Sequence, residues 1–252
     1  MREQEAPRIR IGTSGWQYDH WRGPFYPQDL PKKAFLEHYA EHFDTTEINS
    51  FFYGVPKAET VRRWREEVPE GFRFAVKASR YITHMKKLKD PEPSLERFWE
   101  GAEGLGSRMG PVLFQLPPNW GLNLDRLRRF LEALPSGVRY AFEFRDRSWF
   151  DDSVYQLLEE HNAAFCIYEL GGRSTPCLAT ADFVYIRLHG PEEEYRGSYG
   201  DEALQLWAER LRQWREEGKG GYLFFDNDEA GFAARNALRL RELLGKSIGV
   251  GG

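Results

Sequence analysis

Short runs rich in β-branched and aromatic residues alternate with longer helix-like segments along almost the whole chain. Such alternation is typical of a parallel α/β fold, in which each strand is followed by a crossover segment. The runs that predict strands are residues 8–13, 45–49, 73–79, 111–116, 139–145, 164–169, 183–189 and 221–227.

The segments between these runs carry apolar residues spaced by three and four positions, which places them on one face of a helix. Residues 170–182 contain Gly, Ser and Pro without such a stripe, so we expect the sixth helix to be reduced or missing. The pattern predicts an α/β fold of the (β/α)8 TIM-barrel type with eight parallel strands. The helical stripes lie within 35–43, 61–68, 95–105, 124–134, 154–158, 204–214 and 232–244.

The chain has 252 residues, and a single barrel of this type needs about 250. We therefore expect one barrel domain over 1–252, with an ordered core at 8–245 and flexible tails at 1–7 and 246–252. The strand-to-helix loops are longer than the helix-to-strand turns, and in a barrel they all lie at the C-terminal ends of the strands, where active sites of this fold are found. The longest are 14–31, 80–93 and 190–200.

Composition narrows the class of protein. The net charge of −4 argues against a general nucleic-acid coat protein, so a nucleic acid is an alternative partner that the charge does not favour. The two cysteines, Cys166 and Cys177, suggest neither a disulfide scaffold nor a zinc site. The polar N-terminus lacks the apolar region of a signal peptide, and no apolar run approaches the ~20 residues of a membrane span. We expect a cytoplasmic protein with no membrane partner, and the sequence leaves its oligomeric state open.

Polar residues appear in one alternating set near the ends of six predicted strands. Burying so many polar groups costs several kcal/mol unless they pair with each other or with a ligand. The set therefore predicts either a ligand site at the C-terminal mouth of the barrel or an ion network that plugs it. Its members are Glu47, Asn49, Lys77, Gln115, Glu143, Arg145, Arg187, His189 and Asn227.

These residues match a known family. The chain resembles the YecE-like proteins, the group catalogued as domain of unknown function seventy-two. The resemblance implies a TIM-type barrel and no established reaction, and Asp226 stands where the family pattern has Asn. The matching stretches are GTSGW at 12–16, GPFYP at 23–27, TEINS at 46–50, FRFAVKA at 72–78, LFQLPP at 113–118, FEFR at 142–145, YIRLHG at 185–190 and FDND at 225–228.

Our first hypothesis is an enzyme that needs no cofactor and acts on a small polar, anionic or sugar-like substrate. Arg145 and Arg187 would hold a carboxylate or phosphate through bidentate bonds. The catalytic candidates are Glu47, Lys77, Glu143 and His189, with the two glutamates dividing the acid and base work. In a variant of this hypothesis Lys77 forms a Schiff base, which requires a desolvated amine. The further substrate-binding candidates are Ser14, Trp16, Asn49, Gln115, Trp149 and Asn227.

Two alternatives stay open. The first is a barrel that uses a divalent metal ion as a phosphodiesterase, nuclease or sugar isomerase. A nucleic-acid substrate would then also use the basic loop at 84–89. The second is a non-catalytic module that binds a metabolite or a nucleic acid. The candidate metal ligands are Glu47, His84, Glu143, His189 and Asp226.

Overall fold

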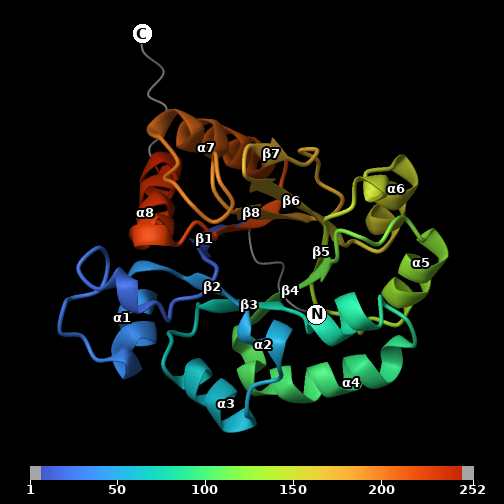
Figure 1. Ribbon diagram of the computed structural model, residues 1–252, viewed down its shortest axis with the longest axis horizontal. Coiled ribbons are helices and arrows are strands. Elements are labelled where there is room, and N and C mark those ends of the chain that lie inside the picture. Colours follow the sequence, from blue (N-terminus) through green and yellow to red (C-terminus); the bar gives the residue numbers. More distant parts are fainter. Residues whose placement is uncertain (1–6, 246–252) are drawn as a thin grey trace.

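The computed structural model describes residues 7–245; the expected flexible tails, apart from Pro7, lie outside the described residues. Eight parallel strands run in the order β1-β9-β8-β6-β5-β4-β3-β2 and form a nearly closed barrel surrounded by helices (Figure 1). The predicted TIM-type fold is confirmed. The strands are β1 (Ile9–Thr13), β2 (Thr45–Ile48), β3 (Arg73–Lys77), β4 (Met109–Leu116), β5 (Tyr140–Phe144), β6 (Ala164–Leu170), β8 (Phe183–Leu188) and β9 (Gly220–Phe225).

Helices follow most strands and pack against the outside of the barrel, as the apolar stripes predict. No helix in the described part of the chain is long and apolar enough to cross a membrane. The helices are α1 (Phe35–His42), α2 (Ser50–Tyr53), α3 (Ala58–Glu66), α4 (Pro91–Ala102), α5 (Leu124–Glu132), α6 (Asp152–Glu160), α7 (Asp201–Glu216) and α8 (Phe232–Gly245).

The missing sixth helix is also confirmed, because residues 171–182 are all described and contain no helix. The short strand β7 (Arg173–Ser174) pairs antiparallel with β6 in its place. Thr180 then reaches back to the start of β6, where its hydroxyl donates to the carbonyl of Ala163 (2.7 Å) and accepts from the amide of Phe165 (2.8 Å). This loop is therefore held to the start of β6 by hydrogen bonds to backbone groups.

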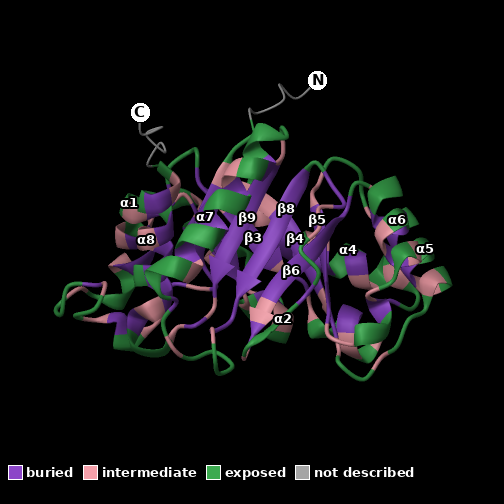
Figure 2. Ribbon diagram, turned by 90° about the horizontal axis from the view of Figure 1, so that it is seen from above, coloured by how far each residue is buried: buried purple, intermediate pink, exposed green. Residues whose placement is uncertain are grey.

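The two faces of the sheet form two separate apolar clusters, as the alternation along the strands predicts. The inner cluster lies inside the barrel and includes Ala75, Leu113, Ala141, Cys166 and Phe224. The outer cluster lies between the strands and the helices. Figure 2 shows buried strands flanked by helices whose outer surfaces are exposed.

The barrel closes between β1 and β2 by a bridge between Ser14 and Glu47. The amide of Gly15 donates to the carbonyl of Glu47 (2.9 Å), and the hydroxyl of Thr46 donates to the carbonyl of Thr13 (3.0 Å). Gly12 allows this close approach, because a Cβ there would lie 2.2 Å from the carbonyl oxygen of Thr45. The seam matters for function since it places the ends of β1 and β2 beside each other.

Candidate functional site

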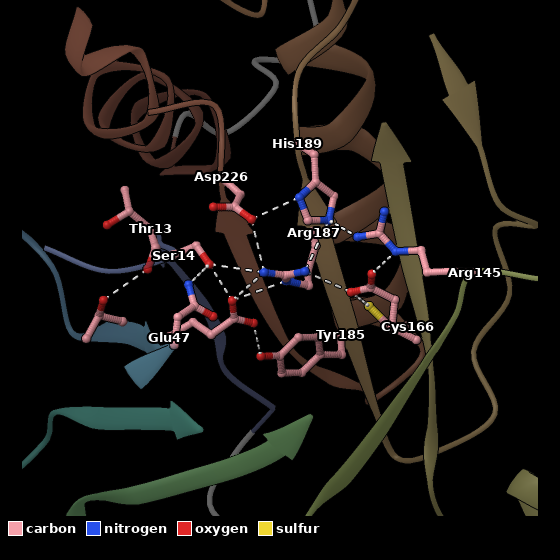
Figure 3. Close-up of polar contacts among 12 residues, drawn as sticks. Thr13, Ser14, Glu47, Arg145, Cys166, Tyr185, Arg187, His189 and Asp226 are labelled. Carbon is pink, nitrogen blue, oxygen red and sulfur yellow. Dashed lines mark hydrogen bonds and ion pairs between the residues drawn. The ribbon is translucent and has the colours of Figure 1, made fainter. Parts of the chain in front are cut away.

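Arg187 lies on the inner face of β8 and is the centre of the polar network (Figure 3). Its side chain is 1% exposed. Its NH2 donates to Glu47 Oε1 (2.7 Å) and Asp226 Oδ2 (3.1 Å), and its NH1 donates to Glu143 Oε2 (2.9 Å). Three carboxylates from β2, β5 and the end of β9 therefore converge on one guanidinium.

Strand register explains this convergence. Arg187 pairs in register with Tyr168 on β6 and Phe224 on β9, and Glu143 pairs with Gln115 on β4. Side chains at one level of a barrel that share the inward direction meet at its axis. Towards the C-terminal ends of β5 and β8 the inward positions change from apolar residues to Glu143 and Arg187, so the polar network lies next to the inner apolar cluster.

Glu47 is fully buried and is held on three sides. Its Oε1 accepts from Arg187 and from the hydroxyl of Ser14, and its Oε2 accepts from the hydroxyl of Tyr185 (2.6 Å). Asn49 donates from Nδ2 to the Ser14 oxygen (2.9 Å), while its buried Oδ1 has no hydrogen-bond partner among the described residues. The amide oxygen of Asn49 thus has unused acceptor capacity inside the cluster.

Glu143 is fully buried between two arginines. Its Oε1 accepts from Nε of Arg145, and its Oε2 accepts from Arg187. Burial alone would raise the pKa of Glu143, but Arg145 and Arg187 outweigh it and hold the pKa well below its ordinary value. Glu143 is therefore ionised at neutral pH and holds no proton to give as an acid.

His189 has its two ring nitrogens in different surroundings. Nε2 lies 3.2 Å from NH2 of Arg145 and 3.2 Å from NH1 of Arg187, while Nδ1 lies 2.9 Å from Oδ2 of Asp226. A guanidinium has donors only, so Nε2 must accept and the ring proton must sit on Nδ1, facing Asp226. Burial and Arg187 lower the pKa of His189, which keeps the ring neutral at neutral pH.

Lys77 ends β3 on the same inner face. Its Nζ lies 4.3 Å from the ring centroid of Phe52, which α2 supplies. Within the described residues Nζ makes no hydrogen bond or ion pair. Burial and Arg187 lower the pKa of Lys77 to about 8, against the opposing effect of the nearby carboxylates. This amine is therefore present in both its charged and its neutral form near neutral pH.

The network is close to charge neutrality. Three carboxylates at Glu47, Glu143 and Asp226 face two guanidinium groups and the amine of Lys77. All five N–H groups of Arg187 have acceptors, because Ser14 and His189 add to the three carboxylates. Arg187 thus has no donor left for a substrate anion. Lys77 and Arg145 remain as the cations at the mouth.

Three predicted binding residues lie away from the network. The ring of Trp16 packs in the outer core against Trp64, with ring centroids 5.4 Å apart. Trp149 stacks on Phe144 at 4.9 Å and donates its indole N–H to the carbonyl of Trp120 (2.6 Å). Both aromatic rings are therefore buried in the apolar core and lie outside the Arg187 network.

Asn227 is the third predicted binding residue that lies away from the Arg187 network. β9 ends at Phe225, and the inward position after it belongs to Asp226. Asn227 points to the other side, where its Nδ2 donates to the carbonyl of Gly197 (2.8 Å) and to Asn236 (3.0 Å). It anchors the loop that follows β8.

The remaining predicted residues lie around the network. Gln115 is half-buried on β4 beside Glu143. His84 lies on the short π-helical turn Tyr81–Met85, where its Nδ1 is 2.8 Å from the hydroxyl of Thr83 and its ring meets the ring of Phe52 at 5.1 Å. His84 is thus a neighbour of Lys77 and not a member of the Arg187 network.

Sequence reasoning missed Tyr185 and Phe52. Tyr185 lies two positions before Arg187, so strand alternation alone places it on the inner face. Phe52 comes from a four-residue helix that shows no periodic signal. Its position over Lys77 follows from tertiary packing and could not be found from spacing.

The carboxylates are poorly arranged for a metal ion. Among the described residues, no group of three or more His, Cys, Asp or Glu is placed to hold one. The guanidinium of Arg187 occupies the position between Glu47, Glu143 and Asp226 that a cation would need.

A separate cleft of about 660 Å³ lies outside the barrel between the start of α4 and α5. It contains no member of the network. Acidic and basic side chains line it in similar numbers, so its charge favours no ligand class, and the mouth of the barrel is the candidate site. The charged residues of the cleft are Lys89, Asp90, Glu92, Asp125, Arg126, Arg129 and Glu132.

Comparison with known proteins agrees with this architecture. The family described as "Protein of unknown function DUF72" matches residues 10–250. The chain is 27% identical to UPF0759 protein YunF of Bacillus subtilis over 269 residues, 94% of each chain. It is 28% identical to UPF0759 protein YecE of Escherichia coli over 95% of this chain and 94% of that one. The crystal structure of a DUF72 family protein from Thermotoga maritima superimposes with a TM-score of 0.86 at 28% identity, covering 95% of this chain and 100% of that one.

Proposed function

We propose, from the premise that this chain belongs to the DUF72 family, that the mouth of its barrel binds a small polar, anionic or sugar-like molecule and performs acid–base chemistry on it. The chemistry needs no metal ion, since Arg187 already neutralises the carboxylates that a metal would use. The active sites of TIM barrels lie at this end of the strands.

The observation that carries the proposal is the unused donor capacity of Arg145. Its Nε is bound to Glu143 and its NH2 contacts His189, but within the described residues its NH1 makes no hydrogen bond. The guanidinium also lies over the ring of Tyr168, with Cζ 4.7 Å from the ring centroid, which fixes its plane. A fixed guanidinium with free N–H groups is suited to hold a carboxylate or a phosphate.

Lys77 is the acid–base residue of the proposal. With a pKa of about 8 it is present in both protonation states near neutral pH, as a proton-transfer group requires. Glu47 and Glu143 support this role by charge, because both are saturated with hydrogen bonds from other side chains. The free amide oxygen of Asn49 supplies an acceptor for a substrate hydroxyl.

A binding test separates this proposal from a purely structural network. Calorimetric titration with inorganic phosphate, glucose 6-phosphate and neutral glucose would measure whether the mouth prefers an anion. Arg145→Gln is expected to weaken binding of the phosphates by about tenfold or more, because a hydrogen bond to a charged group contributes about 1.5–3 kcal/mol. Arg147→Gln is the matched control, since Arg147 is exposed and lies two positions along the same loop. Equal affinity in wild type and Arg145→Gln would overturn the proposal.

A non-catalytic binding module is the second candidate. The saturation of Glu47 and Glu143 by hydrogen bonds favours it, because neither carboxylate is free to move a proton. Under this alternative, Lys77→Gln weakens anion binding and no screened anion is ever converted.

A further inference from the structure

We infer that Lys77 is a nucleophilic amine that forms an iminium bond with a small carbonyl compound carrying an anionic group. The inference rests on the proposed function, because it uses the same mouth and assigns the anionic group to Arg145. It goes further by naming the reacting atom, Nζ of Lys77, and the class of substrate.

The first support is the isolation of the amine. Lys77 is half-buried, and three carboxylates lie in the same cluster. Two of those carboxylates are already occupied, Glu47 by Ser14, Tyr185 and Arg187, and Glu143 by two arginines. Oδ2 of the third, Asp226, accepts from Arg187. Within the described residues Lys77 consequently has no hydrogen bond that would hold its lone pair or its protons.

The second support is the aromatic cover. The ring of Phe52 lies over Nζ, and it is itself packed edge-on against Tyr53 (5.2 Å) and His84 (5.1 Å). Such a cover removes water from one side of the amine, and desolvation favours the neutral, nucleophilic form. The contact with the ring face favours the charged form, so the two effects oppose each other.

The charges around Lys77 also affect the equilibrium between its protonated and neutral forms. The positive charge of Arg187 on β8 disfavours protonation of Lys77, while the pKa of the neighbouring His84 is itself lowered by burial and by Lys77. The carboxylates Glu143, Glu47 and Asp226 favour protonation. Burial and Arg187 dominate, and the pKa falls to about 8, which agrees with the role that the geometry assigns.

The chemical step balances without any further reactant. The lone pair of Nζ forms a bond to the carbonyl carbon while the C=O π electrons move onto the oxygen, and one proton passes from the nitrogen to that oxygen to give a neutral carbinolamine. Loss of that oxygen as water, with one proton taken up from solvent, leaves the iminium. No oxidant or reductant is consumed, and the reverse step with water releases the carbonyl compound.

Reductive trapping tests the inference on the intact protein. The chain is incubated at pH 8 with a low concentration of glyoxylate and cyanoborohydride, and the adduct is located by intact mass and peptide mapping. At that pH the free-amine fraction of Lys77 exceeds that of an ordinary exposed lysine by on the order of a hundredfold. Among the lysine side chains we expect a single adduct, at Lys77, abolished in Lys77→Arg and unchanged in Lys89→Arg, where an exposed lysine is altered. The α-amine of the chain has a similar ordinary pKa and is labelled as well, so peptide mapping counts it separately.

A sample unfolded in urea provides the control for selectivity, since it should label all lysines at similar rates. Lysine labelling of the folded protein that is spread evenly over exposed lysines, or that is undiminished in Lys77→Arg, overturns the inference. If that happens while Arg145→Gln still weakens phosphate binding, only the inference fails and the proposed function stands. A Lys77 adduct in a protein that binds no phosphate supports the nucleophile and overturns the anion site instead.

Discussion

The guanidinium NH2 of Arg187 lies 2.7 Å from Oε1 of Glu47, although the two residues are 140 positions apart in the chain. β8 carries the arginine and β2 the glutamate, so the pair connects strands across the seam where the barrel closes. Charge pairing and barrel closure therefore depend on the same buried contact.

We predict that Glu47→Gln destabilises the folded protein strongly. The guanidinium of Arg187 stays buried in this variant but loses one of the three carboxylates that balance its charge. Removing one partner of a buried ion pair costs about 3–5 kcal/mol. Glu160→Gln, which removes an exposed partner of Arg128, should change stability by less than about 1 kcal/mol. Urea denaturation followed by tryptophan fluorescence measures both, and similar values for the two variants would contradict the prediction.

Gly12→Ala is predicted to open the seam between β1 and β2. The new Cβ would lie 2.2 Å from the backbone oxygen of Thr45, which cannot move without shifting β2. We expect a loss of about 3 kcal/mol, at the upper end of the range for overpacked cores. Gly71→Ala is the matched control, since a Cβ there meets nothing within 4 Å. Equal thermal unfolding temperatures of the two variants would show that the seam can adapt.

The sequence is sufficient to predict the barrel and most of the network, because strand alternation is a local property. It places Glu47, Lys77, Glu143 and Arg187 on one face without any knowledge of contacts. It fails for Asn227, which continues the outward positions of Leu223 and Phe225, so that Asp226 takes the inward position instead.

The different roles of Arg145 and Arg187 also could not be predicted from the sequence. Arg145 and Arg187 look equivalent as candidate anion binders, but the number of carboxylates around each differs in the folded chain. Likewise, nothing local distinguishes a loop tryptophan that faces a ligand from one such as Trp16 that packs in the core. These distinctions arise from tertiary packing.

Stability should fall as the pH is lowered through the range below the ordinary histidine pKa of 6.5. Burial and Arg187 lower the pKa of His189 in the folded state, so the unfolded chain binds the proton more readily. The stabilisation is therefore complete above pH 6.5 and is lost as the pH falls towards the folded-state value. His189→Gln should reduce the loss of thermal stability between about pH 7 and pH 5. An unchanged pH profile in this variant would contradict the assignment of a neutral ring.

Glu143 adds a second loss at lower pH. Its folded-state pKa lies below the ordinary value of 4.5, because Arg145 and Arg187 outweigh its burial. Its contribution is thus present above pH 4.5 and disappears as the carboxylate is protonated. We expect acid unfolding to begin at higher pH in Arg145→Gln than in wild type, as followed by circular dichroism. The control variant Arg147→Gln should unfold at the same pH as wild type.

Phe52 provides the sharpest test of what sets the pKa of Lys77. Burial is the largest cause of the lowered pKa, so Phe52→Ala should admit water and move the pKa from about 8 back towards the ordinary value of 10.5. Loss of the cation–π contact acts in the opposite direction, and Phe52→Leu isolates it, because leucine keeps the cover but has no ring face. Trace labelling with acetic anhydride across a pH series, with peptide mapping, gives the midpoint for Lys77 in each variant. We expect the midpoint to rise in Phe52→Ala and to fall or stay unchanged in Phe52→Leu. A rise of equal size in both would mean that the ring face lowers the pKa, which contradicts the desolvation argument.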